Sequence, residues 1–260
     1  MNPPPCVLLA NGVAGARVLE HALGAGWPIE RLILNRVERQ READRLRATA
    51  DSHGLAISVW SQETKDALVT FAASTDDVWL LSIYFAHLLP AELLGAFGGR
   101  GANVHPSLLP WGRGAHSNVW TLIEGTPAGV SLHLMTERID AGPLLAQRSV
   151  PVYLWDTAAD LHKRLEMACA DLVSENWPEI AGLLPGVPQG DGGSYHAASD
   201  FADVGQVILD DRADAERFFR QLRALSFPPH RGLSIRLGSD VVEARVTLTR
   251  VADDAPGEDA

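Results

Sequence analysis

The sequence has little cysteine and no long hydrophobic run, and each shortage excludes a class of protein. Only Cys6 and Cys169 among its 260 residues are cysteines, and they form no metal-spaced cluster, so neither a disulfide framework nor a cysteine-bound metal is expected. The longest apolar runs, such as residues 78–83, fall far short of the roughly 20 residues that span a bilayer, so we expect no membrane helix. The opening residues lack the features of a secretory signal, and we therefore expect a cytoplasmic protein.

The chain also has fewer basic than acidic residues. The chain has 22 Lys and Arg against 33 Asp and Glu, a formal net charge of −11, and residues 191–260 hold eight Arg, no Lys and thirteen acidic residues. Proteins that bind nucleic acid usually present a basic face, because much of their affinity comes from neutralising phosphates. The charge therefore argues against a nucleic-acid partner and favours small-molecule substrates.

Several common catalytic and nucleotide-binding motifs are missing. The segment after the first apolar run, Asn11–Gly15, lacks the dinucleotide-binding fingerprint, and we interpret its glycines as a tight strand-to-helix turn. The chain has no phosphate-binding Walker loop, no Gly-x-Ser-x-Gly nucleophile elbow and no metal-ligand cluster. A nicotinamide-dependent enzyme, a serine hydrolase of that type and a metal site are therefore not expected.

Short apolar runs alternate with amphipathic stretches as far as about residue 184, which is typical of an α/β protein. Continuously apolar runs such as residues 79–81 indicate central parallel strands that are buried on both faces. We predict a doubly wound, Rossmann-like, mostly parallel sheet with its site beyond the strand ends at Ala10, Ser82 and His105. The expected strands are residues 6–10, 31–35, 55–60 and 78–83, and the expected crossover helices are residues 13–25, 37–53 and 62–73.

The C-terminal third has a different organisation. A longer helix is expected over residues 157–184, with Asp156 as its N-cap, and it runs into a Pro- and Gly-rich stretch over residues 184–194. This stretch predicts a boundary between a domain of residues 1–188 and a small segment of residues 189–260. The elements expected in the small segment are a helix over 213–224, a hairpin of strands 233–237 and 241–249 joined through 238–240, and an acidic tail over 253–260.

Asn103 and His105 are the first candidate site residues. They are two apart on an expected strand, so their side chains share a face and can act on the same substrate atom. Pro106 keeps His105 extended and ends the strand where ligands are expected. The other interpretation of such a pair is a turn or a hydrogen-bonded pair in the core.

His133 and Asp140 are two further candidates. His133 lies on an alternating strand, residues 129–136, on the same face as Ser131 and Met135, and it fits either a site or a structural histidine that is hydrogen-bonded in the sheet. Asp140 follows in a loop whose composition suits a carboxylate placed beside an imidazole, or an ordinary turn-capping aspartate.

These residues belong to a longer series of motifs. The series is Asn103–Pro110, Arg113–Gly114, Gly129–His133, Ile139–Gly142 and Gln147. In this order and spacing it resembles the folate-dependent formyltransferases, which include glycinamide ribonucleotide, methionyl-tRNA and sugar N-formyltransferases. The resemblance covers roughly residues 5–185 and implies a formyltransferase catalytic domain that uses 10-formyltetrahydrofolate and no metal.

The resemblance also implies roles for individual residues. Asn103, His105 and Asp140 match the catalytic asparagine, histidine and aspartate, and His133 matches a histidine that lines the same site. The chemistry suits these residue types. When an amine attacks a formyl group, an amide and a protonated imidazole can stabilise the oxyanion, and a carboxylate can favour the imidazolium and take the amine proton through water.

The family resemblance places the folate mainly against backbone groups of two loops. The positions expected to contact it are Ser82, Tyr84, Phe85, Leu88, His133, Glu137, Ile139 and Gly142.

The C-terminal segment indicates the acceptor. Ser194–Asp200 and Leu222–Arg231 resemble the tail of enzymes that formylate an amino-deoxysugar carried on a nucleoside diphosphate. The candidate substrate contacts are Trp111, Arg113, Phe227 and His230. That subgroup often has tyrosine where this chain has His230, and Phe227–Pro229 is equally well explained as a turn that packs the hairpin against the catalytic domain.

Other functions stay open. Leu109–Gly114 and Trp120 also resemble the formylation domains of peptide-antibiotic assembly lines, so an amino acid, a carrier-bound aminoacyl group or an antibiotic precursor is an alternative acceptor. Methionyl-tRNA is disfavoured by the short acidic tail, and a folate-binding protein without turnover is a further alternative. The apolar hairpin edge over residues 241–248 suits pairing with a second chain, which predicts a possible homodimer.

Overall fold

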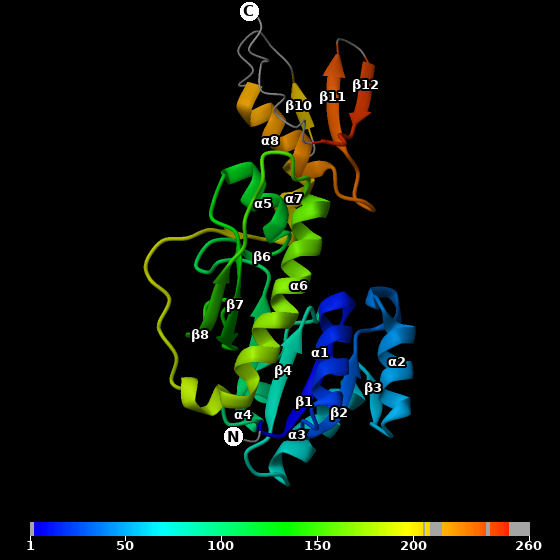
Figure 1. The fold of residues 1–260 in the computed structure, drawn as a ribbon, viewed down its shortest axis with the longest axis vertical. Helices are drawn as coiled ribbons and strands as arrows, with labels where there is room; N and C mark the ends of the chain where they lie inside the picture. Colours follow the sequence, from blue (N-terminus) through cyan, green and yellow to red (C-terminus); the bar gives the residue numbers. More distant parts are fainter. Residues whose placement is uncertain (1–2, 205, 209–214, 238–239, 250–260) are drawn as a thin grey trace, which may run out of the picture.

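The structure is a computed structural model that describes residues 3–204, 206–208, 215–237 and 240–249. At its centre is a seven-stranded sheet with the order β3-β2-β1-β4-β5-β7-β8 (Figure 1). The first five strands in that order are parallel, and β7 and β8 are antiparallel at one edge, which confirms the predicted mostly parallel α/β sheet. The strands are β1 (Cys6–Ala10), β2 (Ile29–Leu34), β3 (Ile57–Val59), β4 (Trp79–Ile83), β5 (Gly101–His105), β7 (Gly129–Leu134) and β8 (Leu144–Ser149).

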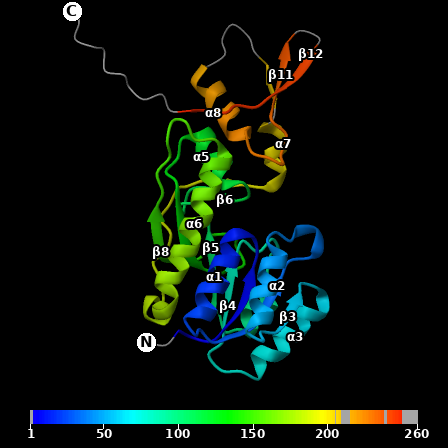
Figure 2. The same cartoon turned by 45° about the vertical axis from the view of Figure 1, so that its right-hand side comes forward.

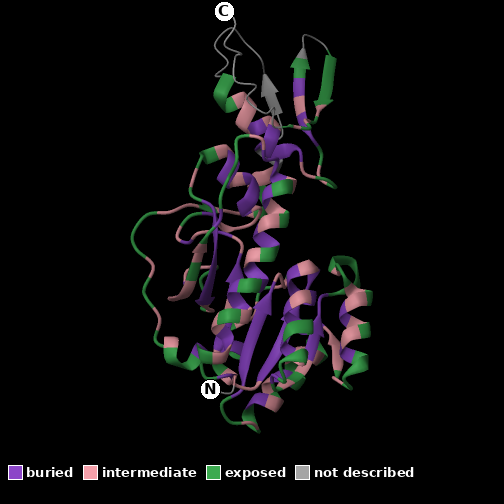
Figure 3. Ribbon diagram, in the orientation of Figure 1, coloured by how far each residue is buried: buried purple, intermediate pink, exposed green. Residues whose placement is uncertain are grey.

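Helices cover both faces of this sheet. Leu8 of β1 packs in a core with α1 and α6, whereas Val7 and Leu9 pack on the opposite face with α3 and α4. The central strands are therefore buried on both sides (Figure 3), and this double burial explains their continuously apolar sequence. The helices are α1 (Gly12–Gly24), α2 (Ala43–Ser52), α3 (Gln62–Ala73), α4 (Ala91–Ala96), α5 (Ser117–Glu124) and α6 (Ala158–Asn176).

Two of the elements predicted before residue 61 are shorter than the sequence suggested. The helix expected over residues 37–53 starts only at Ala43: Val37–Arg39 form a separate 3₁₀ turn that ends at the extended Gln40, and Glu42, the N-cap of α2, has a left-handed backbone (φ 57°). The strand expected over residues 55–60 is only β3, Ile57–Val59.

The start and end of α6 also differ from the prediction. Thr157 rather than Asp156 is the N-cap, and its side chain and that of Asp160 form a capping box. Asp156 instead accepts a hydrogen bond from the Tyr153 N–H and pairs with Arg164. The α-helix ends at Asn176 because Pro178 lacks the N–H that the next turn needs, and residues 177–183 form a 3₁₀ helix. No helix in the described ranges combines the length and hydropathy needed to cross a membrane.

The C-terminal segment forms a second, smaller sheet that projects beyond α5 and α6 (Figures 1 and 2). The predicted hairpin is present as β11 (Leu233–Leu237) and β12 (Asp240–Ala244), but β12 is shorter than expected and β10 (Gln206–Ile208) adds a parallel strand. Helix α8 (Ala215–Leu225) packs against α5. The predicted helix start at 213–214, the hairpin turn at 238–239 and the acidic tail lie outside the described residues, and the boundary at residue 188 stays a prediction.

β12 lies at an edge of this sheet. Its Val241 and Val242 are exposed, and no strand in the described residues pairs with its outer side. Pairing of this edge with a second copy stays a prediction.

Trp177 anchors the base of the larger core. Its side chain is fully buried, with Trp27 stacked at 6.4 Å and Trp79 edge-on at 5.8 Å between ring centroids. We predict that Trp177→Ala lowers the free energy of unfolding by about 3–5 kcal/mol, because it leaves a large cavity. Leu154→Ala, at a side chain that is 72% exposed, is the control and should change it by less than about 0.5 kcal/mol. Equal urea midpoints for the two variants would contradict this account of the core.

Candidate functional site

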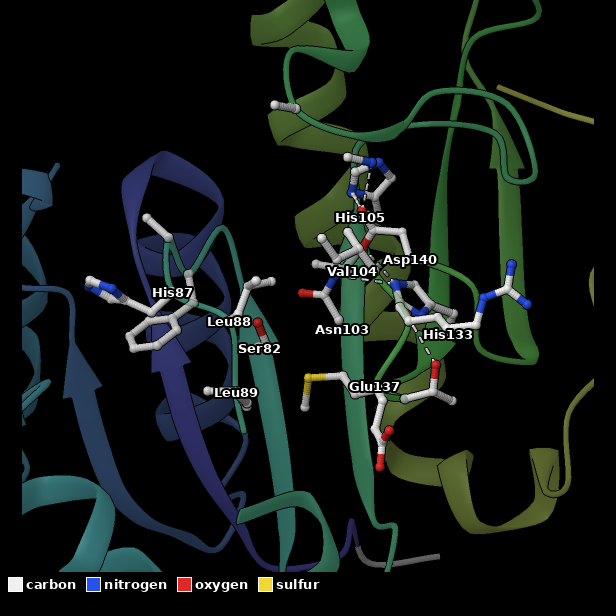
Figure 4. A pocket seen from close by; sticks show the side chains of 18 of the residues that line it. Ser82, His87, Leu88, Leu89, Asn103, Val104, His105, His133, Glu137 and Asp140 are labelled. Atoms are coloured by element: carbon white, nitrogen blue, oxygen red, sulfur yellow. Dashed lines mark hydrogen bonds and ion pairs between the residues drawn. The ribbon is translucent and has the colours of Figure 1, made fainter. Parts of the chain in front are cut away.

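A pocket of about 720 Å³ lies beyond the carboxyl ends of β4 and β5, where the topology predicts a ligand site. Its walls come from the end of β4 and the loop 84–91, from β5, from the loop 135–140, and from residues 195–198 of the C-terminal segment. Figure 4 shows Asn103, His105, His133 and Asp140 gathered on one wall, with Leu88 and Leu89 across the cavity. Asn103 and His105 therefore line the same pocket, as their spacing predicted.

The amide of Asn103 is oriented by the neighbouring strand. Asn103 on β5 is paired with His133 on β7, and its Nδ2 lies 3.2 Å from the His133 Nε2. His133 Nδ1 lies 2.8 Å from the Leu134 carbonyl oxygen, so Nδ1 carries a proton there and a neutral His133 accepts at Nε2. His133 is thus both buried and part of the pocket lining, and it holds the Asn103 amide with one N–H directed at the histidine.

His105 is held between two acceptors. Its Nε2 lies 2.8 Å from the Gly112 carbonyl oxygen, and its Nδ1 lies 3.4 Å from Oδ2 of Asp140. A neutral imidazole has only one N–H, so donation to both partners requires the imidazolium form. The imidazolium is therefore the form in which His105 can donate to both groups at once.

The carboxylate of Asp140 is surrounded by polar groups of neighbouring residues. Its side chain is 12% exposed, its Oδ2 accepts a 3.0 Å hydrogen bond from the Gly114 N–H, and its Oδ1 lies 3.5 Å from the His133 Nε2. Burial by itself would raise the pKa of this carboxyl, but the charge of His105 and the hydrogen bond from Gly114 outweigh burial and hold the pKa well below its usual range. Asp140 is therefore a carboxylate at every physiological pH.

Most of the positions predicted to contact folate line this pocket. Those in its lining are Ser82, Tyr84, Phe85, Leu88, His133, Glu137 and Ile139. Gly142 is not in the lining. A Cβ at this position would lie 1.9 Å from the Leu134 carbonyl oxygen, so the glycine allows the end of the loop to pack directly on β7.

The predicted substrate contacts are not in the pocket lining. The Arg113 guanidinium binds the side chain of Gln189, and Trp111 is 39% exposed on the loop before β6 (Arg113–Gly114). Phe227 and His230 pack against each other with ring centroids 5.2 Å apart, and the Phe227 ring lies 5.1 Å from that of His162.

Phe227 and His230 belong to a group that we call the histidine–aromatic cluster. Its members are His116, His162, Phe201, Phe227 and His230. Tyr84 connects it to the pocket, because Tyr84 lines the pocket and its ring centroid lies 5.9 Å from that of His162.

Arg41 and His162 were missed by sequence reasoning. An Arg41 guanidinium nitrogen lies 3.5 Å from the His162 Nε2, and another lies 3.3 Å from the Glu166 Oε1. Burial above all, and then the charges of Arg41 and His230, lower the pKa of His162 to about 4. The only available signal was the four-residue spacing of His162 and Glu166, which places both on one face of α6.

Comparison with known proteins finds formyltransferases in each case. Residues 34–175 match the family described as formyl transferase. The chain is 33% identical over 217 residues to a methionyl-tRNA formyltransferase from Halorhodospira halophila, an alignment that covers 83% of this chain and 68% of that protein. It is 30% identical over 148 residues to a dTDP-4-amino-4,6-dideoxyglucose formyltransferase from Mycobacterium tuberculosis, covering 56% of this chain and 62% of that protein.

Solved structures share the fold. A sugar N-formyltransferase from Shewanella has a TM-score of 0.77 at 22% identity, with 95% of this chain and 99% of that chain covered. An N-formyltransferase from Helicobacter canadensis, solved with folinic acid and dTDP-3-aminofucose, has a TM-score of 0.72 at 19% identity, with 92% and 85% covered. At these identities the likeness establishes the common architecture, including its C-terminal part.

The low pKa of His162 predicts a pH dependence of stability. The unfolded chain takes up a proton on His162 near its ordinary pKa of 6.5, whereas the folded chain does so only near 4. The unfolded state therefore binds more protons in this window, and the folded state loses up to about 3 kcal/mol as the pH falls from 6.5 to 4. His162→Gln should flatten that part of the stability curve, measured by urea unfolding at several pH values.

His53→Gln is the matched control, because His53 is exposed on the surface. It should leave the slope of stability against pH unchanged. The comparison uses slopes, so a general loss of stability in His162→Gln does not affect it, and equal slopes for His162→Gln and the unmodified protein would refute the assignment.

Proposed function

This chain belongs to the formyl transferase family, and on that premise we propose that it transfers the formyl group of 10-formyltetrahydrofolate to the primary amine of a nucleotide-linked amino sugar. The observation that carries the proposal is the meeting of Asn103, His105 and Asp140 on one wall of a single pocket. The curated relatives are covered over 68% and 62% of their lengths, so the activity is inferred from the family together with this geometry.

The three residues suit the reaction. The amine attacks the formyl carbon, the carbonyl oxygen becomes an oxyanion, and the bond from carbon to the folate nitrogen then breaks. The Asn103 amide keeps one N–H bonded to His133, which leaves its second N–H to donate to the oxyanion. His105 supplies a positive charge on the same wall, already in place before the negative charge develops.

The proton balance assigns a role to Asp140. The attacking amine loses one proton and the departing folate nitrogen gains one, so no net store of protons is required. Because its pKa lies well below the usual range, Asp140 is a weak base that releases a proton at once. We assign it to holding His105 charged and oriented and to passing the amine proton on through water.

The size and lining of the pocket suit a folate, the formyl donor. Its volume of about 720 Å³ is of the size that buries a drug-sized ligand. Apolar side chains such as Leu89, Leu94 and Met135 offer surfaces for a flat ring system, and the backbone of the loop 136–140 offers polar groups nearby.

The acceptor side is inferred from the histidine–aromatic cluster. The ring faces of Phe227 and His230 suit a nucleobase, and the half-exposed guanidinium of Arg41 suits a diphosphate. Tyr84 places this surface next to the catalytic wall. The sugar N-formyltransferases among the related proteins support the same acceptor class.

A second acceptor is supported by one comparison. The 33% identity to a methionyl-tRNA formyltransferase makes methionyl-tRNA the second candidate. The excess of acidic residues in 191–260 opposes binding of a polyanion, so we rank it below an amino-sugar nucleotide.

The decisive test is an assay of the purified protein with 10-formyltetrahydrofolate and a panel of acceptors, with tetrahydrofolate release and product mass as readouts. We expect one amino-sugar nucleotide to be formylated. Transfer only to methionyl-tRNA or to amino acids would retain the chemistry and overturn the acceptor, and folate binding without any transfer would overturn the enzymatic proposal.

Asn103→Ala and His105→Ala test the assigned roles. Each should lower kcat by at least about 100-fold, because the first removes a donor to the developing oxyanion and the second removes the positive charge on the same wall. His53→Gln on the distant surface should retain the full rate. If either site variant reacts at close to the rate of the unmodified enzyme, the role assigned to that residue is wrong.

A further inference from the structure

Residues 187–196 leave the C-terminal end of the larger fold and return to the pocket, and we call them the return segment. In Figure 1 this stretch of chain runs up beside β8 and crosses to β6. It is attached at both ends: Val187 forms a two-hydrogen-bond bridge with Leu144 of β8, and β9 (Tyr195–His196) pairs in parallel with β6.

Gln189 is the side chain of this segment that reaches two loops of the site. Its Oε1 accepts hydrogen bonds from the Arg113 guanidinium at 3.0 and 2.7 Å. Its Nε2 donates to the carbonyl oxygens of Asp140 and Gly142, each at 2.8 Å. All the hydrogen-bonding capacity of the Gln189 amide is thus directed at the loops that carry Gly114 and Asp140.

Those two loops must keep a fixed position relative to each other. Asp140 has a left-handed backbone (φ 49°), which is costly for a residue other than glycine and persists only where its surroundings enforce it. The Asp140 carboxylate accepts from the N–H of Gly114, the residue that follows Arg113. Gln189 therefore joins the backbone of Asp140 to the same loop that binds its carboxylate.

The return segment also supports the partner of His105. The Ser194 Oγ accepts from the Gly112 N–H at 3.0 Å, and the Gly112 carbonyl oxygen in turn accepts from His105. The return segment lies so close to β6 that only glycine fits at position 114, since a Cβ on Gly114 would lie 2.2 Å from the His196 carbonyl oxygen. Both neighbours of the His105 imidazole are thus held by one segment.

We propose that Gln189 is a positioning residue for the transfer reaction, which holds Asp140 against His105 by bonding the loops 111–115 and 137–142 together. This proposal rests on the proposed function, since it concerns the same site. Gln189 is absent from the pocket lining, so it acts through Asp140 and not on a substrate.

The first test is kinetic. Gln189→Ala should lower kcat about 10- to 100-fold, because a displacement of the order of 1 Å in a reacting group costs that much. Gln189→Glu keeps an acceptor for Arg113 but loses both donors, so it should be impaired to the same extent. Gln62→Ala, an exposed glutamine that bonds Asp66 on α3, is the control and should retain the unmodified rate.

A double-mutant cycle with Arg113→Ala separates positioning from substrate binding. If Arg113 and Gln189 act through the same link, the double variant should be no slower than Gln189→Ala alone. Losses that multiply would show independent roles and would overturn the linkage. A kcat of Gln189→Ala within twofold of the unmodified enzyme would overturn the proposal as a whole.

A second measurement requires no turnover. The carboxyl carbon of Asp140, followed by NMR, should show no titration down to pH 4 in the unmodified protein, since its pKa lies well below the usual range. In Gln189→Ala the displaced, still buried carboxyl should titrate at or above the ordinary value of about 4. An unchanged Asp140 titration would refute the positioning role, and an inactive unmodified protein with the expected NMR difference would refute the proposed function alone.

Discussion

The buried carboxylate of Asp140 is the group on which the arrangement of the site depends. An ionised carboxylate away from water must be paired and hydrogen-bonded, or it takes up a proton. Here the partners come from two places in the chain: His105 at the end of β5 and the Gly114 N–H on β6. The need to compensate one charge therefore brings separate segments to the same point, and the same partners keep the charge in place.

The seven-stranded sheet supplies the rigid part of this arrangement. The pairing of β5 with β7 places Asn103 opposite His133, and the chain ends β5 at His105, just before Pro106. The remaining parts are loops that the sheet does not hold. The return segment holds them instead, through the side chains of Gln189 and Ser194 and the backbone pairing of β9 with β6. Residues beyond the expected boundary at 188 thus take part in building the wall of the pocket.

The histidine–aromatic cluster connects the larger and smaller parts of the protein. His162 comes from α6, His116 precedes α5, and Phe227 and His230 come from the segment between α8 and β11. Burial lowers the pKa of each of the three histidines, so the cluster is held together mainly by uncharged rings. The cationic group at its margin is Arg41, which faces both His162 and Glu166.

The sequence by itself determined the alternation of strands and helices, the parallel sheet with its site at the strand ends, and the common face of Asn103 and His105. These features depend on local periodicity and on the breaks at Gly and Pro, which neighbours in sequence decide. It did not determine the start of α2 at Ala43, the addition of β10 to the hairpin, or the positions of Arg41, His162 and Gln189. Only the tertiary structure decided these, because each depends on contacts between residues far apart in the chain, such as Gln189 with Asp140, and spacing along a sequence carries no record of such contacts.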